Sequence, residues 1–434
     1  MDPSPDRPSP RLVRRSGIPT IAALLVAACW LLGASPAHAQ TEDHPAPPPG
    51  YQPAIPDVGG RELDKTAVDT HWFTFRLGLA PIFDYTWFTQ DLPSVEQVGV
   101  QDDAFQVRSG RIQARGKIFA RKSAPWRYLF SFEYRGFDSN PNETWTFTDI
   151  ALTIPVGRAL GELTLGKIKE PFAYEMVGDA ANLPHVERLM SPFFVSRNIG
   201  ARLDNTMAGQ RMTWSFGVYN DWWTTDVDYD ESGWQVDARL TGLAFTNQAG
   251  TRYLHLGTAW RYNGADQGTL RFRGKPESNV TSNYVDTGNM AGDHSNHVGF
   301  EALWNEGPFS ITAEYIHAFV DAPQSGDPSF HGYYATASYV LTGEHRPYDR
   351  KVGYARRILP TGRWGAFEVI GRFGLVDLND QRMAGGLEQK TFAGLNWWAN
   401  RRWRLSVGYG RARLDKLGTV GYTNQYFTRV QWIY

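Results

Sequence analysis

Short runs in which apolar and polar side chains alternate recur from residue 72 to the end of the chain, and they restrict the fold more than any other feature. In residues 126–135, W-R-Y-L-F-S-F-E-Y-R, aromatic side chains occupy the even positions and mostly polar or charged ones the odd positions. Because successive side chains of a strand point to opposite faces, this segment is predicted to be a strand with one aromatic and one charged face. In a soluble sandwich the aromatic face would form the core, whereas in an outer-membrane barrel it would meet lipid and the charged face would line a wet lumen.

The same alternation predicts further strands along most of the chain. They are expected at residues 73–79, 83–87, 111–118, 150–154, 163–172, 211–220, 234–241, 254–262, 270–275, 298–304, 309–315, 333–341, 367–375, 391–398, 404–409 and 426–434. Gly307-Pro308 is a tight turn, whereas residues 279–296 and 322–328 are long and polar, which is typical of barrels with short turns at one end and long loops at the other. No helical periodicity of useful length follows residue 40, which argues against an α/β fold.

Residues 1–39 have the features of an export signal. Arg11, Arg14 and Arg15 precede an apolar stretch at residues 21–32, and a small-x-small cleavage site ends at Ala39. A membrane anchor is an alternative, but the apolar stretch is shorter than the ~20 residues that a membrane span needs. A lipoprotein box ending at Cys29 is another alternative, but the apolar stretch continues beyond that cysteine.

Charge and cysteine usage exclude several classes of protein. With 44 basic and 45 acidic residues the formal net charge is −1, so the chain lacks the basic excess that is typical of nucleic-acid binding. Cys29 is the only cysteine and lies in the predicted signal, so neither a disulfide framework nor a thiolate metal site is expected. A mean hydropathy of −0.42 with 14% aromatic residues is typical of a barrel with a polar lumen and aromatic girdles, although a large secreted β-protein would also have it.

The sequence carries no catalytic motif. It lacks G-x-S-x-G, H-E-x-x-H and a P-loop, which mark hydrolases, zinc proteases and nucleotide-binding proteins. Asp293 and His294 with His297 come nearest to a metal-ligand cluster, but they are expected in an exposed loop. We therefore predict neither an enzyme nor a metal or cofactor site.

The last nine residues, Y-F-T-R-V-Q-W-I-Y, form a predicted closing strand that ends on an aromatic residue. This ending resembles the signal by which outer-membrane proteins are recognised for assembly, and it predicts the barrel assembly machinery as a partner. The location predicted is the outer membrane of a Gram-negative bacterium. The fold class predicted is all-β, a transmembrane antiparallel β-barrel over residues 72–434, which follows the signal at 1–39 and a proline-rich periplasmic segment at 40–71 where proline disfavours helix and sheet.

Several stretches of the chain resemble the phosphate-selective porin O/P family. The longest is F-Q-V-R-S-G-R-I-Q-A-R-G-K-I-F at residues 105–119, and the most specific is L-T-G-E-H-R-P-Y at residues 341–348. Shorter matches lie at residues 165–172, 187–188, 196–200, 365–368 and 394–398. The resemblance covers residues 73–434 and implies a sixteen-stranded outer-membrane porin, usually a homotrimer, that passes small inorganic anions and in its best-known members prefers phosphate or polyphosphate.

An anion pore needs positive side chains that project into a narrow, water-filled path. Arginine adds bidentate geometry for oxyanions, whereas lysine acts as a point charge. The candidate pore-lining and anion-binding residues are Arg111, Arg115, Lys117, Arg135, Lys167, Lys169, Arg188, Arg197, Arg239, Arg261, Arg271, Arg273 and Lys275. They include three clusters on separate predicted strands, at 111–117, 167–169 and 271–275, of which we expect at least two to meet at the constriction.

Residues 173–197 are expected to form the long loop after the fifth strand, folded inward to narrow the pore. The resemblance implies lysine in this loop for phosphate-selective members, but this chain has none between Phe172 and Arg197. Its ionisable residues there are His185, Arg188, Glu175, Asp179 and Glu187. This departure leaves two alternatives open: a weakly selective general porin, and a structural or adhesive barrel without significant conductance.

Two glutamates in the family-like motifs, Glu170 and Glu344, have two interpretations. They are either filter groups that tune selectivity or structural partners of wall arginines such as Arg346. The structural interpretation is the prediction, because buried or half-buried carboxylates in a barrel wall are normally paired.

Overall fold

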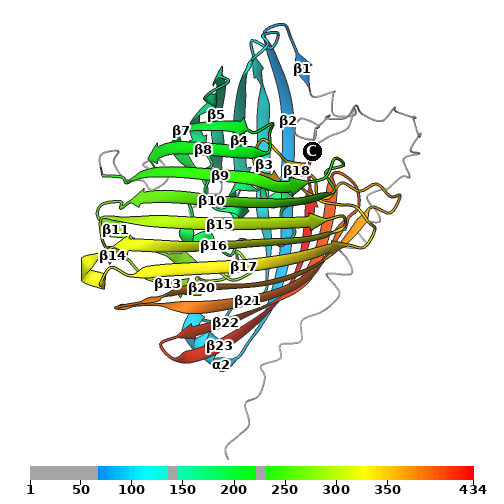
Figure 1. Ribbon diagram of the computed structural model, residues 1–434. Helices are drawn as coiled ribbons and strands as arrows, with labels where there is room; N and C mark the ends of the chain where they lie inside the picture. The colour runs from blue at the N-terminus through cyan, green and yellow to red at the C-terminus, as the bar shows by residue number, and fades with distance from the viewer. Residues whose placement is uncertain (1–66, 135–144, 221–230) are drawn as a thin grey trace, which may run out of the picture. The chain divides into compact units, whose positions relative to one another are not determined.

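The computed structural model describes residues 67–134, 145–220 and 231–434, and over these residues the chain is almost entirely β-sheet (Figure 1). Sixteen long strands close into one antiparallel barrel. The predicted export signal, most of the proline-rich segment and Arg135 lie outside the described residues. None of the described helices has the length and apolarity that a membrane crossing needs.

Each barrel strand pairs with the strands before and after it in the chain. The strands are β2 (Phe73–Gln90), β3 (Ala104–Ile118), β4 (Trp126–Tyr134), β5 (Trp145–Gly157), β6 (Gly161–Ile168), β7 (Asn198–Met207), β8 (Met212–Asn220), β9 (Trp234–Thr246), β10 (Arg252–Gly264), β15 (His294–Glu306), β16 (Phe309–Asp321), β17 (Ser329–Val340), β20 (Ala366–Asp380), β21 (Met383–Trp398), β22 (Trp403–Lys416) and β23 (Thr419–Trp432). The barrel closes where β23 pairs with β2, with Phe83 opposite Val430. Closure leaves the sheet without an open edge. A sheet that spans a membrane has to close in this way, because lipid offers no hydrogen bonds to unpaired backbone groups.

Side chains alternate between a wet inner face and an aromatic outer face, as the sequence predicts. On β4, Phe130 is 49% exposed, whereas Ser131 and Glu133 are 1% and 2% exposed. Aromatic rings also pair across neighbouring strands, for example Trp403 with Trp432 at a centroid distance of 6.1 Å. The aromatic face therefore points outward, where a membrane barrel meets lipid.

The two ends of the barrel differ in their connections. At the turn end, where the chain also ends, most strands are joined by short turns such as 158–160 and 307–308. The exception is residues 341–365, here named the turn-end loop, which contain β18 (Tyr348–Asp349) and β19 (Tyr354–Ala355). This asymmetry agrees with the predicted alternation of short and long connections. The predicted proline-rich segment also ends in a short strand, β1 (Val68–Asp69), which pairs with the start of β2.

The opposite end, the loop end, carries the short helices and most of the long connections. Helix α2 (Leu92–Val98) begins at Asp91, whose carboxylate accepts a 2.9 Å hydrogen bond from the Ser94 backbone N–H, and η4 (Pro323–Ser325) joins β16 to β17. Residues 169–197, named the inner loop, contain α3 (Tyr174–Val177), η2 (Ala180–Asn182) and η3 (Ser191–Phe193). Residues 265–293, named the outer loop, contain four short strands: β11 (Thr269–Leu270), β12 (Arg273–Gly274), β13 (Val285–Asp286) and β14 (Met290–Ala291).

The outer loop corrects one predicted strand. Residues 270–275 were expected in the barrel wall, but they form the short strands β11 and β12, which pair with β14 and β13 rather than with a barrel strand. The alternation itself is real, because Leu270 and Phe272 are 4% and 3% exposed. Their apolar side chains anchor a loop to the lumen instead of facing lipid.

Two histidines are also placed differently from the prediction. His294 and His297 belong to β15 and not to an exposed loop. His294 lies 3.6 Å from Asp321, whereas the His297 ring bonds the carbonyl of Phe193 in the inner loop at 2.8 Å. Because the two side chains lie on opposite faces of one strand, they cannot share a metal ion. Among the described residues no group of three or more His, Cys, Asp or Glu could hold one.

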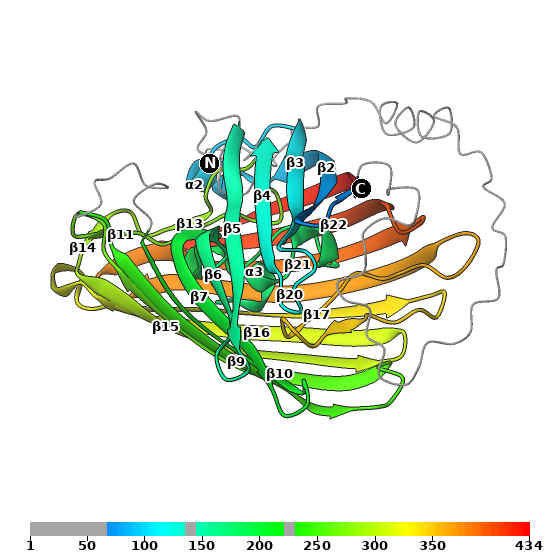
Figure 2. The same cartoon turned by 90° about the horizontal axis from the view of Figure 1, so that it is seen from above.

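The inner loop fills part of the lumen with an apolar core. Figure 2 shows α3 inside the ring of strands. The buried cluster joins side chains of the inner loop, the outer loop and the wall, among them Phe172, Leu189, Met190, Phe193, Leu270, Phe272, Val285, Ile316, Phe330 and Leu378. Burying these side chains removes apolar surface from water, so both loops are held against the wall.

Glycines on the inner face of the wall make room for the loop. A Cβ at Gly374 on β20 would lie 2.0 Å from Leu189, and a Cβ at Gly332 on β17 would lie 2.8 Å from Phe193. Both distances are shorter than any real carbon–carbon contact. These wall positions therefore require glycine for the inner loop to pack as closely as it does.

We expect Gly374→Ala to loosen the inner loop. The added methyl group would overpack the contact with Leu189, at a cost of about 1–3 kcal/mol. Urea unfolding of the detergent-solubilised protein measures the loss. Gly371→Ala is the matched control, because a Cβ at Gly371 on the same strand meets nothing within 4 Å. Equal unfolding midpoints for the two variants would contradict this packing account.

Candidate pore constriction

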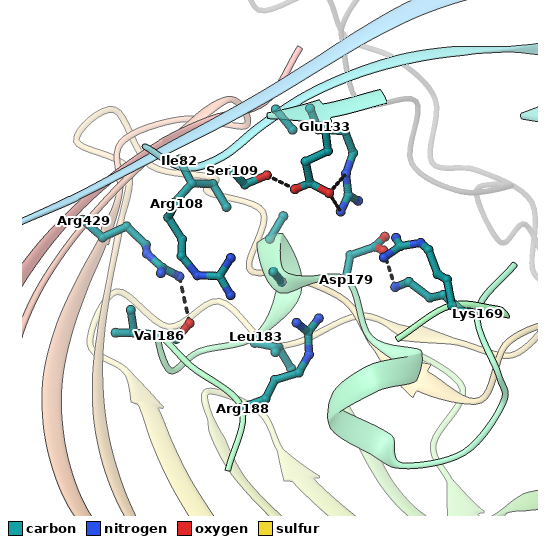
Figure 3. Close-up of a pocket in the computed structure, with 15 residues that line it drawn as sticks. Ile82, Arg108, Ser109, Glu133, Lys169, Asp179, Leu183, Val186, Arg188 and Arg429 are labelled. Atoms are coloured by element: carbon teal, nitrogen blue, oxygen red, sulfur yellow. Dashed lines mark hydrogen bonds and ion pairs between the residues drawn. The ribbon is translucent and has the colours of Figure 1, made fainter. Parts of the chain in front are cut away.

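A cavity of about 50 Å³ lies between the inner loop and the wall strands β2, β3, β4 and β23 (Figure 3). Six cationic side chains line it, namely Arg108, Arg111, Lys169, Arg188, Arg197 and Arg429. They come from β3, from β23 and from both ends and the middle of the inner loop. The fold thus gathers positive charge at one cavity beside the inner loop.

Glu175 is the centre of the contacts that hold the inner loop. Its carboxylate accepts hydrogen bonds from the backbone N–H groups of Leu189 and Met190 at 2.9 and 3.0 Å, and it pairs with Arg372 of β20. His185 Nε2 lies 3.0 Å from the same carboxylate. Burial alone would raise the pKa of Glu175, but Arg372 and His185 hold it at about 2. The group is therefore ionised at neutral pH and ties both halves of the loop to the wall.

Wall arginines also satisfy the backbone of the inner loop. Arg404 donates to the carbonyls of Leu183 and Pro184 at 2.7 and 2.8 Å, and Arg429 donates to the carbonyl of Val186 at 2.9 Å. A carbonyl folded away from bulk water needs such a donor. Some arginines of the inner wall therefore hold the inner loop in place.

Most cations of the cavity already face a carboxylate. Arg108 makes a bidentate contact with Glu187 at 2.6 and 2.9 Å. Four further pairs are Arg429 with Asp84 at 2.7 Å, Arg197 with Asp149 at 2.9 Å, Arg111 with Glu133 at 2.8 Å, and Lys169 with Asp179 at 2.8 Å. At least five carboxylates thus face the six cations, so charges of both signs meet at the cavity.

Arg188 and Lys169 are the two cations of the cavity whose pKa values are lowered. Arg188 donates to the carbonyls of Glu175 and Gly178, and burial together with repulsion from Arg108 lowers its pKa to about 10. Figure 3 shows Arg108 and Arg188 pointing into the cavity from opposite sides. Burial lowers the pKa of Lys169 to about 8 in spite of its pairing with Asp179. Asp179 is 46% exposed on its side chain, so water screens part of its attraction.

Four of the sequence-predicted residues meet in this cavity: Arg111, Lys169, Arg188 and Arg197. Two of the three predicted clusters therefore contribute one residue each, Arg111 from 111–117 and Lys169 from 167–169. Arg115 and Lys117 follow Arg111 on the same face of β3, towards the turn end. Lys167, which is 7% exposed, is not among the residues that line the cavity.

The third predicted cluster belongs to another segment and does not line the cavity. Arg271, Arg273 and Lys275 belong to the outer loop, where Arg271 pairs with Asp286 at 2.5 Å and Lys275 donates to the carbonyl of Asn279 at 2.8 Å. None of the three lines the cavity. The prediction that they face the lumen from a wall strand is therefore wrong, because the segment is not a wall strand.

Arg239 and Arg261 face the lumen but serve other contacts. Arg239 pairs with Glu301 at 2.6 Å and donates to the carbonyls of Val352 and Gly353 at 2.9 and 2.7 Å, which fastens the turn-end loop. Glu301 reaches Arg239 across Gly257, where a Cβ would lie 2.5 Å from its carboxylate. Arg261 pairs with Glu170.

The prediction for Glu170 is confirmed, and the prediction for Glu344 is wrong. Glu170 pairs with a wall arginine, Arg261, as predicted. Glu344 does not: it accepts from the backbone N–H of Thr361 at 3.0 Å, and Arg346 pairs with Glu368 instead. Glu344 therefore makes a local hydrogen bond within the turn-end loop. Sequence alternation cannot predict such a bond.

Sequence reasoning missed Arg108 and Arg429. The β2–β3 register shifts between Ile82 and Phe83, and this bulge turns both Arg108 and Ser109 inward, each 6% exposed. Strict alternation from Arg111 places Arg108 on the outer face, so no simple pattern finds it. Arg429 lies on the inner face of the closing strand opposite Asp84, and alternation applied to residues 426–434 would have found it.

A closed barrel with an aromatic outer face and a charged constriction defines the class of the protein as a porin. The family model described as "Phosphate-selective porin O and P" matches residues 83–431. Porin O of Pseudomonas aeruginosa is 23% identical over 425 residues, which cover 89% of this chain and 93% of that protein. The chain belongs to the phosphate-selective porin O and P family, as the sequence motifs indicate.

Solved porins share the fold at low identity. OmpT of Vibrio cholerae superposes with a TM-score of 0.55 and 10% identity, over 85% of this chain and 99% of OmpT. The anion-selective porin from Comamonas acidovorans gives a TM-score of 0.53 and 13% identity, over 83% of this chain and all of that one. The protein is therefore an outer-membrane porin of a Gram-negative bacterium, and its aromatic face contacts outer-membrane lipid.

We expect Glu175→Gln to destabilise the inner loop strongly. The change removes the charge that compensates buried Arg372, and breaking such a pair costs about 3–5 kcal/mol. The urea midpoint in detergent reports the loss. Glu306→Gln is the matched control, because Glu306 and its partner Arg252 are 38% and 57% exposed, where a pair contributes about 0–1 kcal/mol. Similar losses in both variants would contradict the central role of Glu175.

The same carboxylate predicts an acid limit for the loop. Its pKa is about 2 in the folded protein against an ordinary 4.5, so its stabilisation is complete above about pH 4.5 and is lost as the pH falls towards 2. Urea midpoints measured from pH 6 to pH 2 follow this loss. In Glu175→Gln this component of the pH dependence is expected to disappear; an unchanged acid slope in the variant would contradict the assignment.

Proposed function

We propose that the protein forms a water-filled channel for the passive diffusion of small anions across the outer membrane, with residues 173–197 as the constriction loop. The observation that carries this proposal is the convergence of six cationic side chains on one narrow cavity. Cations fixed along a narrow path lower the energy of an anion there, and passive diffusion needs no catalytic group. The opposing carboxylates offset part of this positive charge, which favours weak binding and rapid exit over tight capture.

Family membership makes phosphate and polyphosphate the first candidate solutes of the channel. The family model is described as "Phosphate-selective porin O and P", and arginine suits oxyanions through bidentate contacts. Against them stands the absence of lysine between Phe172 and Arg197. A weakly selective general pore is the second candidate, and the carboxylate partners of five of the six cations are the observation that favours it.

The remaining parts of the proposal concern processing and assembly. Residues 1–39 would be removed as an export signal, and residues 40–71 would remain in the periplasm. The aromatic-ended closing strand supports recognition by the barrel assembly machinery. A homotrimer is supported by a solved OmpT described as a trimer, with a TM-score of 0.50.

The reversal potential in a planar bilayer under a KCl gradient tests the channel directly. We expect an anion-selective potential for the wild type and a potential closer to zero for Arg188→Gln, which removes one cavity charge. Arg271→Gln in the outer loop is the control and should leave the potential unchanged. A cation-selective wild type would contradict the anion channel, and absence of conductance would favour the structural barrel.

Selectivity is also expected to fall as the pH rises from 7 to 9. The pKa of Lys169 is about 8, so its positive charge is present below that pH and is lost above it. In Lys169→Arg, whose guanidinium stays charged, the step should vanish while anion selectivity persists. The reversal potential measured at each pH decides this, and a step of the same size in the variant would assign it to another group.

A further inference from the structure

The cavity is lined by apolar side chains as well as by cations, and the proposed anion channel does not account for them. Apolar side chains of β2 and the inner loop also line the cavity, namely Ala80, Ile82, Ala180, Ala181, Leu183 and Val186. Ala180 and Ala181 are half-buried. The cavity lining therefore combines N–H donors with hydrocarbon surface.

The charged part of the surface suits one planar oxyanion. Figure 3 shows the guanidinium groups of Arg108 and Arg188 directed into the cavity from opposite sides, with Leu183 and Val186 beside them. Arg108 is anchored by Glu187 and Arg188 by two backbone carbonyls. Anchored guanidinium groups lose little side-chain freedom when an anion arrives, which favours binding by fixed donors.

We infer that the constriction takes short-chain organic monocarboxylates in preference to inorganic phosphate. A carboxylate group would accept from Arg108 and Arg188, and its alkyl group would pack against apolar lining side chains such as Ala180, Ala181 and Leu183. This inference rests on the proposed anion channel and specifies the class of solute that its narrowest point favours.

Phosphate fits the same surface less well. Its four oxygens point in all directions and are strongly hydrated, so some of them must face the apolar wall. An oxygen that loses water without gaining a donor is destabilised, and more so when it carries charge. The wall that stabilises an alkyl group therefore disfavours phosphate at the same position.

The size of the cavity limits the length of the acid. A single water molecule needs a cavity of about 10–15 Å³. A cavity of about 50 Å³ therefore holds a few water molecules or one small anion. Formate leaves the apolar wall untouched, whereas acetate and propionate reach it. Each CH₂ that becomes fully buried should strengthen binding by up to about fourfold, and the gain should end once the cavity is full.

The test is block of chloride current in planar bilayers by formate, acetate, propionate and phosphate at one pH and ionic strength. We expect the half-blocking concentration to fall about two- to fourfold per carbon from formate to propionate, and phosphate to block less than propionate. Ala180→Ser and Ala181→Ser put a hydroxyl group into the apolar wall, so each should weaken the dependence on chain length and strengthen phosphate block. Ala159→Ser, the same change in an exposed turn, is the matched control and should alter neither.

The outcomes separate this inference from the proposed function. Anion-selective conductance with stronger block by phosphate, or with no dependence on chain length, would overturn the inference and leave the anion channel intact. Cation-selective or absent conductance would overturn the proposed function itself. A shift in Ala159→Ser equal to that in the cavity variants would also overturn the inference, because the apolar wall would then have no specific role.

Discussion

The pairing of every backbone polar group is the constraint on which the rest of this structure depends. Lipid offers no hydrogen bonds, so the sheet has to close, and β23 does so against β2. Closure fixes the inner and outer faces of all sixteen strands at once. The same requirement continues inside the lumen, where the inner loop can fold in only because wall side chains donate to its carbonyls.

The inner wall is therefore rich in arginine for two reasons that compete. The inner loop is anchored by wall arginines. Arg372 pairs with Glu175, and Arg404 and Arg429 donate to backbone carbonyls of the loop. These contacts occupy N–H groups of the arginines. Arg188 and Lys169 also line the cavity, where burial lowers the pKa of both groups.

The sequence predicts the barrel well because its strongest signal, period-two alternation, is the signal that a lipid-facing wall imposes on each strand. The position of the inner loop after the fifth strand and the pairing of Glu170 also follow from motif and alternation. The site is harder to predict, because it depends on departures from alternation. A bulge turns Arg108 inward, and the alternating segment at 270–275 buries its apolar side chains in the lumen instead of facing lipid. Contacts between distant segments, such as Glu187 with Arg108, have no sequence signature at all.

The central claim is that Ala180 of the inner loop borders a narrow, positively charged path, and modification of a single cysteine there tests it most directly. Cys29 is the only natural cysteine and lies in the predicted export signal, so Ala180→Cys would provide one reactive thiol in the processed protein. Anionic and cationic methanethiosulfonate reagents of similar size are then compared by their rates of current reduction in planar bilayers. The account predicts a clear fall in current and faster reaction with the anionic reagent. Modification without loss of current, or equal or faster reaction with the cationic reagent, would contradict it.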